Sequence, residues 1–229
     1  MCAVSRAATA VSTETRIAGG AAEPPRMGTS RLEAFSDGVI AVAVTLLVLD
    51  IHVPELSRNE TLLHALLHDW PHYAAYVVSF MTIGIIWINH HAMISRLARA
   101  DHSILILNLL LLMGIVLLPF ATELMAAYLR APSGQSLAAG VYGGSFLLMA
   151  VAFATLNRHI LLNRAHMLKA ELPLEERHRI LSRSVSGLAP YLVATVLAVV
   201  SPYATIVICG ALALFYALPI ASGGAARQQ

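Results

Sequence analysis

The stretch RLEAFSDGVIAVAVTLLVLDIHV, residues 31–53, decides the fold. Its residues 38–49 carry no charge, and a helix of about 20 apolar residues spans the hydrocarbon core of a bilayer. Asp37 stands at the start of that run. An ionisable side chain in a membrane span is costly and persists mainly where it faces protein or water and has a partner. The stretch predicts a transmembrane helix whose Asp37 is held by Arg31 and by donors from the second span.

The composition of the whole chain indicates a membrane protein. Of its 229 residues, 58% are hydrophobic and 12% are charged, whereas soluble domains carry about 25% charged residues. So little polar surface cannot cover a globule in water. The net charge of +2 and the lack of a basic stripe with interleaved aromatic residues argue against nucleic acid as a partner. The sequence has no GxSxG, HExxH or P-loop motif, so we expect neither an enzyme nor a cofactor.

Six apolar segments are near the length that crosses a bilayer as a helix. They are Arg31–Val53, His72–His91, Ser103–Tyr128, Ser136–Arg158, Ser184–Val200 and Pro202–Ala221. The predicted fold class is an all-α, integral membrane bundle of six transmembrane helices over residues 31–221. We expect residues 1–30, rich in Ala, Gly, Ser and Thr, to be a disordered cytoplasmic N-terminal tail, and residues 222–229 to be a C-terminal tail.

The basic residues predict the orientation, because cytoplasmic loops of membrane proteins are enriched in Lys and Arg. With the N-terminus in the cytoplasm, all of the 15 Lys and Arg residues except Arg58 and Arg130 fall on the cytoplasmic side. Both termini are then cytoplasmic, which requires an even number of spans, and we expect a multi-pass protein of the cell membrane. No internal repeat is visible, so a pore, if the protein forms one, needs several subunits.

One face of the first span carries an aliphatic stripe. At about 100° per residue, Val42, Leu46 and Leu49 lie close together on a helix, with Thr45 beside them, while Ser36 and Asp37 point to other sides. The polar motif can therefore bond helices of its own bundle while the stripe faces something else. Periodicity alone leaves open whether the stripe lines a pore, packs against a helix or contacts lipid.

The second span ends in Trp87-Ile-Asn89-His90-His91, which supplies polar groups for the motif of the first span. A histidine can donate to a carboxylate or a hydroxyl. We infer a structural network that fixes the first helix against its neighbours. Its members are Arg31, Phe35, Ser36, Asp37, Trp87, Asn89, His90 and Asn108. A metal site at the two adjacent histidines is the rival interpretation, but neighbouring residues on a helix diverge and cannot readily share one ion.

Arg31, Phe35, Ser36 and Asp37, followed by residues 45–49 (TLLVL) and then by 87–91 (WINHH), resemble the TMEM175 family of potassium-permeable channels in its bacterial single-repeat form. The resemblance implies a homotetramer in the bilayer, with the first helix of each subunit lining a central pore. It also implies an apolar constriction at Val42, Leu46 and Leu49, where the family commonly has Ile at the first position. Thr45 would then be a pore-lining hydroxyl that can help to coordinate a cation.

The permeant ions implied are potassium and other monovalent cations, with dewetting of the apolar neck as the gate. The segment GVYGG, residues 140–144, lies in a continuous apolar span, so we interpret it as small-residue helix packing and expect no carbonyl filter of the TVGYG type. Two alternatives remain: a secondary transporter that is proton-coupled through Asp37 and His90, and a non-conducting membrane scaffold.

Three histidines recur at four-residue spacing between the first and second spans, namely His64, His68 and His72. On one helix they would share a face and could bind a metal or protons. Pro71 would break such a helix before His72. The favoured interpretation is an amphipathic interfacial turn, because four leucines lie among them.

Overall fold

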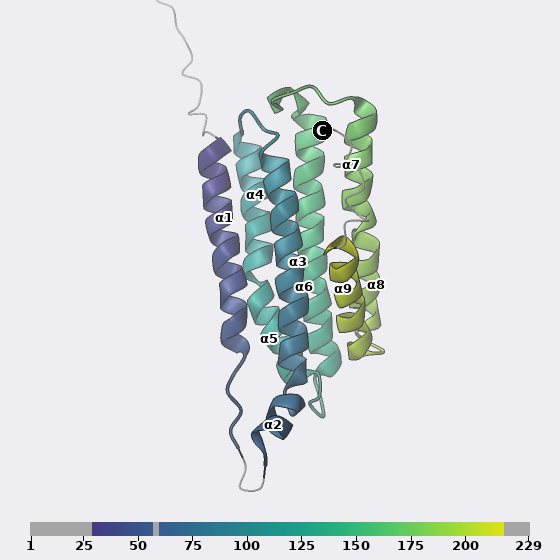
Figure 1. Cartoon of the computed structure of the whole chain (residues 1–229). Helices are drawn as coiled ribbons and strands as arrows, with labels where there is room; N and C mark the ends of the chain where they lie inside the picture. The colour runs from purple at the N-terminus through teal and green to yellow at the C-terminus, as the bar shows by residue number, and fades with distance from the viewer. Residues whose placement is uncertain (1–28, 57–59, 218–229) are drawn as a thin grey trace, which may run out of the picture.

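The computed structural model describes residues 29–56 and 60–217, and this part of the chain is nearly all helical. The elements are α1 (Thr29–Leu46), the 3₁₀ helix η1 (Leu47–Asp50), α2 (Leu62–His68), α3 (Trp70–Ile94), α4 (His102–Val116), α5 (Leu118–Tyr128), α6 (Gln135–Arg158), the π-helical turn η2 (His159–Asn163), the 3₁₀ turn η3 (Ala165–Met167), α7 (Leu174–Ser186), α8 (Leu188–Leu197) and α9 (Pro202–Ala217). The long helices stand side by side in one bundle (Figure 1). The predicted all-α bundle is confirmed.

Within residues 29–56 and 60–217, five segments are long and apolar enough to cross a membrane. They are Thr29–Asp50, Trp70–Ile94, His102–Tyr128, Gln135–Asn163 and Leu174–Leu197. The sixth apolar helix, α9, is shorter, with 16 residues. The predicted sixth span continues to Ala221, but residues 218–221 lie outside the described residues, as do the C-terminal tail and residues 1–28 of the predicted N-terminal tail.

The boundaries of the first and the fifth span differ from prediction. The first helix begins at Thr29, inside the predicted tail, and its last turn tightens into η1, so that residues 51–53 are not helical. The fifth span begins at Leu174 rather than at Ser184. Basic residues made 174–183 look like a loop, but α7 is amphipathic: it buries Leu181, while Arg179 and Arg183 are exposed to solvent or to a cavity. A charged face does not prevent a helix from forming when one stripe is apolar.

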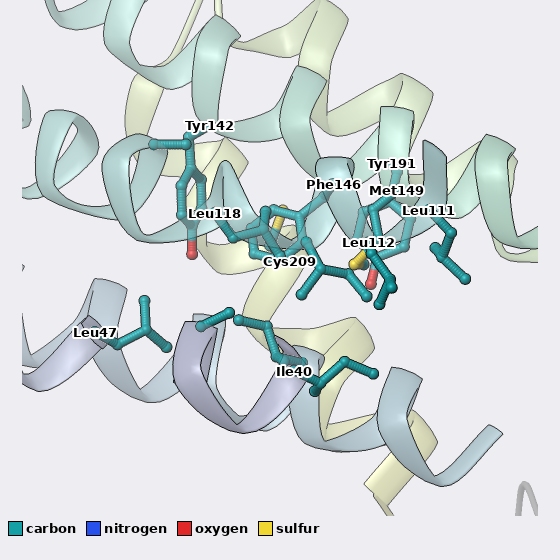
Figure 2. Close-up of a cluster of buried hydrophobic side chains, with 14 of the residues drawn as sticks. Ile40, Leu47, Leu111, Leu112, Leu118, Tyr142, Phe146, Met149, Tyr191 and Cys209 are labelled. Carbon is teal, nitrogen blue, oxygen red and sulfur yellow. The ribbon is translucent and has the colours of Figure 1, made fainter. Parts of the chain in front are cut away.

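The core lies around α6, which packs against α4, α5, α8 and α9. Three aromatic residues form its centre, as Figure 2 shows. The Tyr142 ring meets the Phe146 ring edge-on at 4.8 Å between centroids, and Phe146 stacks on Tyr191 at 5.8 Å. All three side chains are buried. This core holds α3, α4 and α5 as a fixed surface on which α1 rests.

The segment 140–144 lies inside the regular helix α6. A Cβ placed on Gly143 would lie 3.1 Å from Thr195 Cα, so the missing side chain lets the backbone of α8 approach closely. The Tyr142 hydroxyl lies 3.1 Å from Ser79 Oγ of α3. This geometry is that of small-residue helix packing.

Helix α1 lies at the edge of the bundle and packs against α3, α4 and α5 (Figure 1). Its buried face consists of Leu32, Ser36, Ile40 and Ala43, and continues at Leu47 of η1. These positions recur every three or four residues, which is the spacing of one helix face. The opposite face of α1 is covered by none of the described residues.

Candidate functional site

The free face of α1 carries the predicted constriction residues. Val42 is 57% exposed, Leu46 is 40% exposed and Leu49 is 66% exposed. Val42 and Leu46 are one helical turn apart on α1, while Leu49 lies in the tighter turn η1. Neighbouring Leu47 is 0% exposed. In the described part of the chain this aliphatic row is largely uncovered, so it is available to face lipid, a pore or another subunit.

Thr45 lies on the same exposed side as this row. Its hydroxyl donates to the carbonyl oxygen of Val42, three residues earlier, at 2.9 Å. This back-bond occupies the hydroxyl proton and leaves the oxygen lone pairs directed outward as acceptors. The Thr45 side chain can therefore offer an oxygen to a cation on the free face of the helix.

The opposite face of α1 is anchored by a buried polar chain across three helices. Ser36 Oγ donates to Leu32 O at 2.9 Å, so it accepts from Asn108 Nδ2, also at 2.9 Å. The amide oxygen of Asn108 then faces His90 Nε2 at 2.7 Å, which must carry the proton. Ser36, His90 and Asn108 are each 0% exposed. Buried hydrogen bonds of this kind fix the rotation and height of α1 against α3 and α4.

Asp37 has a different partner. Trp87 Nε1 of α3 donates to its Oδ1 at 2.9 Å, so the expected donor from the second span is present. Arg31 is exposed, and among the described residues it makes no ion pair with Asp37. The remaining predicted members lie outside this chain of bonds: Phe35 is 54% exposed on the free face, and Asn89 Nδ2 donates only to Ile85 O at 2.8 Å.

The sequence analysis missed an ion pair beside this motif. His91 Nδ1 lies 2.9 Å from Glu33 Oε1, and ligand atoms of Glu33, Asp37 and His91 all lie within 4.8 Å of one another. These three are the side chains through which the described part of the chain could hold a metal ion. The two adjacent histidines diverge as expected, since His90 points to Asn108 and His91 points to Glu33. In the sequence, the i, i+4 spacing of Glu33 and Asp37 indicates only that both carboxylates lie on one face of the first helix; it does not indicate that His91 lies beside them.

At the opposite end of the bundle the three spaced histidines do not share one helix. His64 and His68 lie on α2, and His72 lies on α3, because the helix is interrupted at Asp69. Pro71 is in the first turn of α3, where a missing N–H costs nothing. His72 Nδ1 lies 2.7 Å from Asp69 Oδ1.

Beside the constriction residues, a groove with wholly apolar walls runs along the free face of α1. It is lined by Ala34, Phe35, Gly38, Val39, Val42 and Val116. A Cβ placed on Gly38 would meet nothing within 4 Å. The groove thus offers room at a small residue, where another helix can approach.

Residues 31–119 match the family described as endosomal/lysosomal potassium channel TMEM175. A protein from Streptomyces collinus named as a potassium channel is 44% identical over 188 residues, which is 81% of this chain and 90% of that protein. The human endosomal/lysosomal proton channel TMEM175 is 36% identical over 113 residues, which is 46% of this chain and 22% of that protein.

A solved structure agrees with the sequence relatives. The crystal structure of a lysosomal potassium-selective channel TMEM175 homologue from Chamaesiphon minutus superposes with a TM-score of 0.74 at 40% identity. The match covers 86% of this chain and 98% of that one. The family is one of ion channels and not of enzymes. The chain is therefore a membrane protein that belongs to the TMEM175 family.

Proposed function

We propose that this protein is a potassium-permeable channel with an apolar constriction on helix α1. The observation that carries the proposal is the division of α1 into two faces. One face is anchored by the buried chain from Ser36 through Asn108 to His90, and the other presents Val42, Leu46 and Leu49 to the outside. The potassium channel names of the bacterial relatives that match most of the chain support the same function.

Four copies of α1 around one axis would convert each exposed aliphatic position into a ring. A narrow apolar ring expels water. An ion could cross it only by losing hydration water that the apolar side chains do not replace, so the ring blocks ions. The rings would thus close the pore by dewetting, and widening them would open it. The anchored face would keep Leu46 at a fixed height, since rotation of α1 would break the hydrogen bond that Asn108 of α4 donates to Ser36.

We propose assembly into a homotetramer, in which the number four is what the family resemblance implies. One helix cannot enclose a pore, so a pore lined by α1 needs several copies of the chain. The groove around Gly38 fits a helix of a second copy, because close helix approach in membranes occurs at small residues. In the orientation that we propose, the N-terminus and the C-terminus of the chain are both cytoplasmic, in keeping with the distribution of basic residues.

Selectivity in this channel would come from the neck and from oxygen ligands next to it. The Thr45 hydroxyl donates to Val42 O, so in the proposed pore its oxygen lone pairs would coordinate a passing cation. The segment 140–144 lies within the regular helix α6, where backbone carbonyls accept helical hydrogen bonds, so we expect no carbonyl filter there. We therefore expect a modest preference for potassium over sodium, and no cofactor beyond the permeant ions.

The deciding experiment is single-channel recording of the purified full-length protein in a planar bilayer, together with a potassium-gradient flux assay in liposomes. A channel gives unitary current steps, a transporter gives slow flux without steps, and a scaffold gives neither. A second flux arm with a proton gradient and no potassium separates potassium permeation from proton permeation, for which the name of the human relative gives a reason to test. Absence of potassium steps would overturn the proposal.

A further inference from the structure

A cavity of about 500 Å³ lies away from the pore face, between α3, α6 and α7. Helix α9 borders it: its Tyr216 lies against Gly187, where α7 passes into α8. In Figure 1 the last turn of α9 stops at about that level, while α7 continues along α6. The cavity is of a size that holds a small molecule or part of a lipid, since ligand pockets measure about 300–1,000 Å³.

The walls of this cavity divide into two kinds. Ile86, Met149 and Phe153 supply apolar surface. Arg96, just beyond the end of α3, and Arg183 of α7 supply two guanidinium groups. Among the described residues, neither guanidinium forms a hydrogen bond or an ion pair. Both arginines belong to the end of the bundle that the charge distribution assigns to the cytoplasm.

The side-chain amide of Asn157 lies in the wall of the cavity, and its oxygen accepts no hydrogen bond from the described residues. Asn157 is 3% exposed, and its Nδ2 donates to Ser184 Oγ at 2.8 Å. The Ser184 hydroxyl itself donates to Ile180 O, so its oxygen must accept, and this fixes the orientation of the amide. The Oδ1 atom of Asn157 is buried and has no hydrogen-bond partner among the described residues. A buried carbonyl oxygen of this kind is costly unless a ligand or water donates to it.

We propose that this cavity binds an anionic phospholipid whose headgroup carries a hydroxyl group. The arginines would bind the phosphate, Asn157 Oδ1 would accept from the headgroup hydroxyl, and the apolar wall would hold the start of an acyl chain. Basic pockets between transmembrane helices on the cytoplasmic side bind anionic headgroups through the same attraction between basic side chains and phosphate. A free phosphate would satisfy the arginines, but it would leave the apolar wall uncovered.

Native mass spectrometry of the detergent-solubilised full-length protein tests the proposal, with phosphatidylglycerol, phosphatidic acid and phosphatidylcholine of equal chain length as probes. We expect phosphatidylglycerol to be retained over phosphatidylcholine. Arg96→Gln combined with Arg183→Gln should weaken its retention by about tenfold or more. The matched control is Arg99→Gln combined with Arg179→Gln, because these arginines do not line the cavity. This control should retain the lipid.

Two further variants separate the parts of the site. Ala150→Phe fills the cavity and leaves both arginines in place, so it should also lose the lipid. Asn157→Leu should reduce the retention of phosphatidylglycerol more than that of phosphatidic acid, because the glycerol hydroxyls of the phosphatidylglycerol headgroup then lose their acceptor.

Three results would overturn the proposal. The first is equal retention of phosphatidylglycerol and phosphatidylcholine by the wild type. The second is equal loss in the control pair of arginine variants. The third is displacement of the lipid by glycerol 3-phosphate at the same concentration, which would indicate a site for a soluble anion.

Discussion

At the scale of single residues, Asn108 is the centre of the polar chain that sets the position of α1. It is the acceptor for the His90 ring and the donor to Ser36. Nδ1 of His90 has no partner in the described part of the chain. Loss of the Asn108 amide would therefore leave the whole buried ring without a hydrogen bond, whereas Ser36 would keep its bond to Leu32.

Asn108→Leu should lower the free energy of unfolding by about 1–3 kcal/mol, the usual cost of leaving a buried polar group unpaired. Thermal unfolding of the detergent-solubilised protein measures the effect. Thr155→Val is the control, since Thr155 is exposed and bonds only to Val151 O. Adding His90→Leu to Asn108→Leu should recover part of the loss, because both unpaired partners are then apolar. An Asn108→Leu protein as stable as the control would contradict this role.

A second residue-scale prediction concerns Asp101, outside the membrane spans. It caps α4 by accepting from Ile104 N at 2.9 Å, and Arg164 Nε donates to it at 2.5 Å. Partial burial opposes ionisation, but the Ile104 N–H and the Arg164 guanidinium outweigh it and lower the pKa of Asp101. The carboxylate thus stabilises the fold above its unfolded pKa, and this contribution is lost as the pH falls through the lowered folded value.

Asp101→Asn should therefore be less stable than the wild type at pH 7, by about 0.5–1 kcal/mol, because the ion pair is partly solvated. The difference should shrink once the pH falls below the ordinary Asp value of 3.8. Unfolding scans of both proteins from pH 7 to pH 3 provide the check. A constant difference across that range would indicate that the cap, and not the charge, matters.

At the scale of elements, two glycines of α6 offer a matched comparison. A Cβ on Gly143 would lie 3.0 Å from Thr195 Oγ1 and 3.1 Å from Thr195 Cα, while a Cβ on Gly140 would meet nothing within 4 Å. Gly143→Ala should push α8 away from α6 and destabilise the protein by about 1–3 kcal/mol. Gly140→Ala should be neutral or stabilising, by up to about 1 kcal/mol, because Ala favours a helix.

Thermal unfolding of the two alanine variants decides between packing and a filter for residues 140–144. Loss of stability at Gly143 without a change in ion preference supports packing. Altered potassium selectivity in a stable Gly143→Ala protein would place the segment in the ion path instead.

Helix α1 carries the prediction that tests the mechanism. Leu46→Ala should raise resting conductance and weaken discrimination between potassium and sodium, because a wider neck admits water more easily. Leu46→Asn should raise resting conductance still more, because a polar side chain lets water enter the neck more readily. Leu47→Ala is the control: that side chain is 0% exposed on the anchored face, so its truncation should cost about 2–5 kcal/mol of stability with unitary current unchanged. Unitary current and reversal potential in mixed salts are the readouts, and no change at Leu46 would remove it from the pore.

The elements also show how far the sequence could predict the structure. The stripe on α1 was predictable because Val42 and Leu46 follow the helical period, and the buried partner Asn108 was predictable because a polar group in a span needs one. The helical extent of α7 was not predicted, because its arginines indicated a polar loop and the single buried residue Leu181 gives only a weak apolar stripe. The ion pair of Glu33 and His91 joins different helices, and only tertiary packing brings those together.

At the scale of the whole molecule, the bundle leaves an apolar surface that no described residue of the same chain covers. Lipid can cover such a surface as well as protein can, so hydrophobicity alone does not bring transmembrane helices together. Close packing at small residues is what brings transmembrane helices together. The groove around Gly38, between Phe35 and Val42, is the place on α1 where a second copy can approach to contact distance.

Gly38→Leu should therefore disrupt assembly and leave the subunit folded, because a Cβ at Gly38 meets no atom of the described residues within 4 Å. The wild type in detergent should have a protein mass of four times 24.5 kDa, about 98 kDa, after correction for bound detergent. The variant should shift to smaller species with unchanged helix content by circular dichroism. Gly140→Leu is the control, since it also places a side chain in open space, but on α6, away from α1. A Gly38→Leu protein that keeps the fourfold mass would show that copies meet elsewhere, and a conducting monomer of the wild type would refute a pore built from four α1 helices.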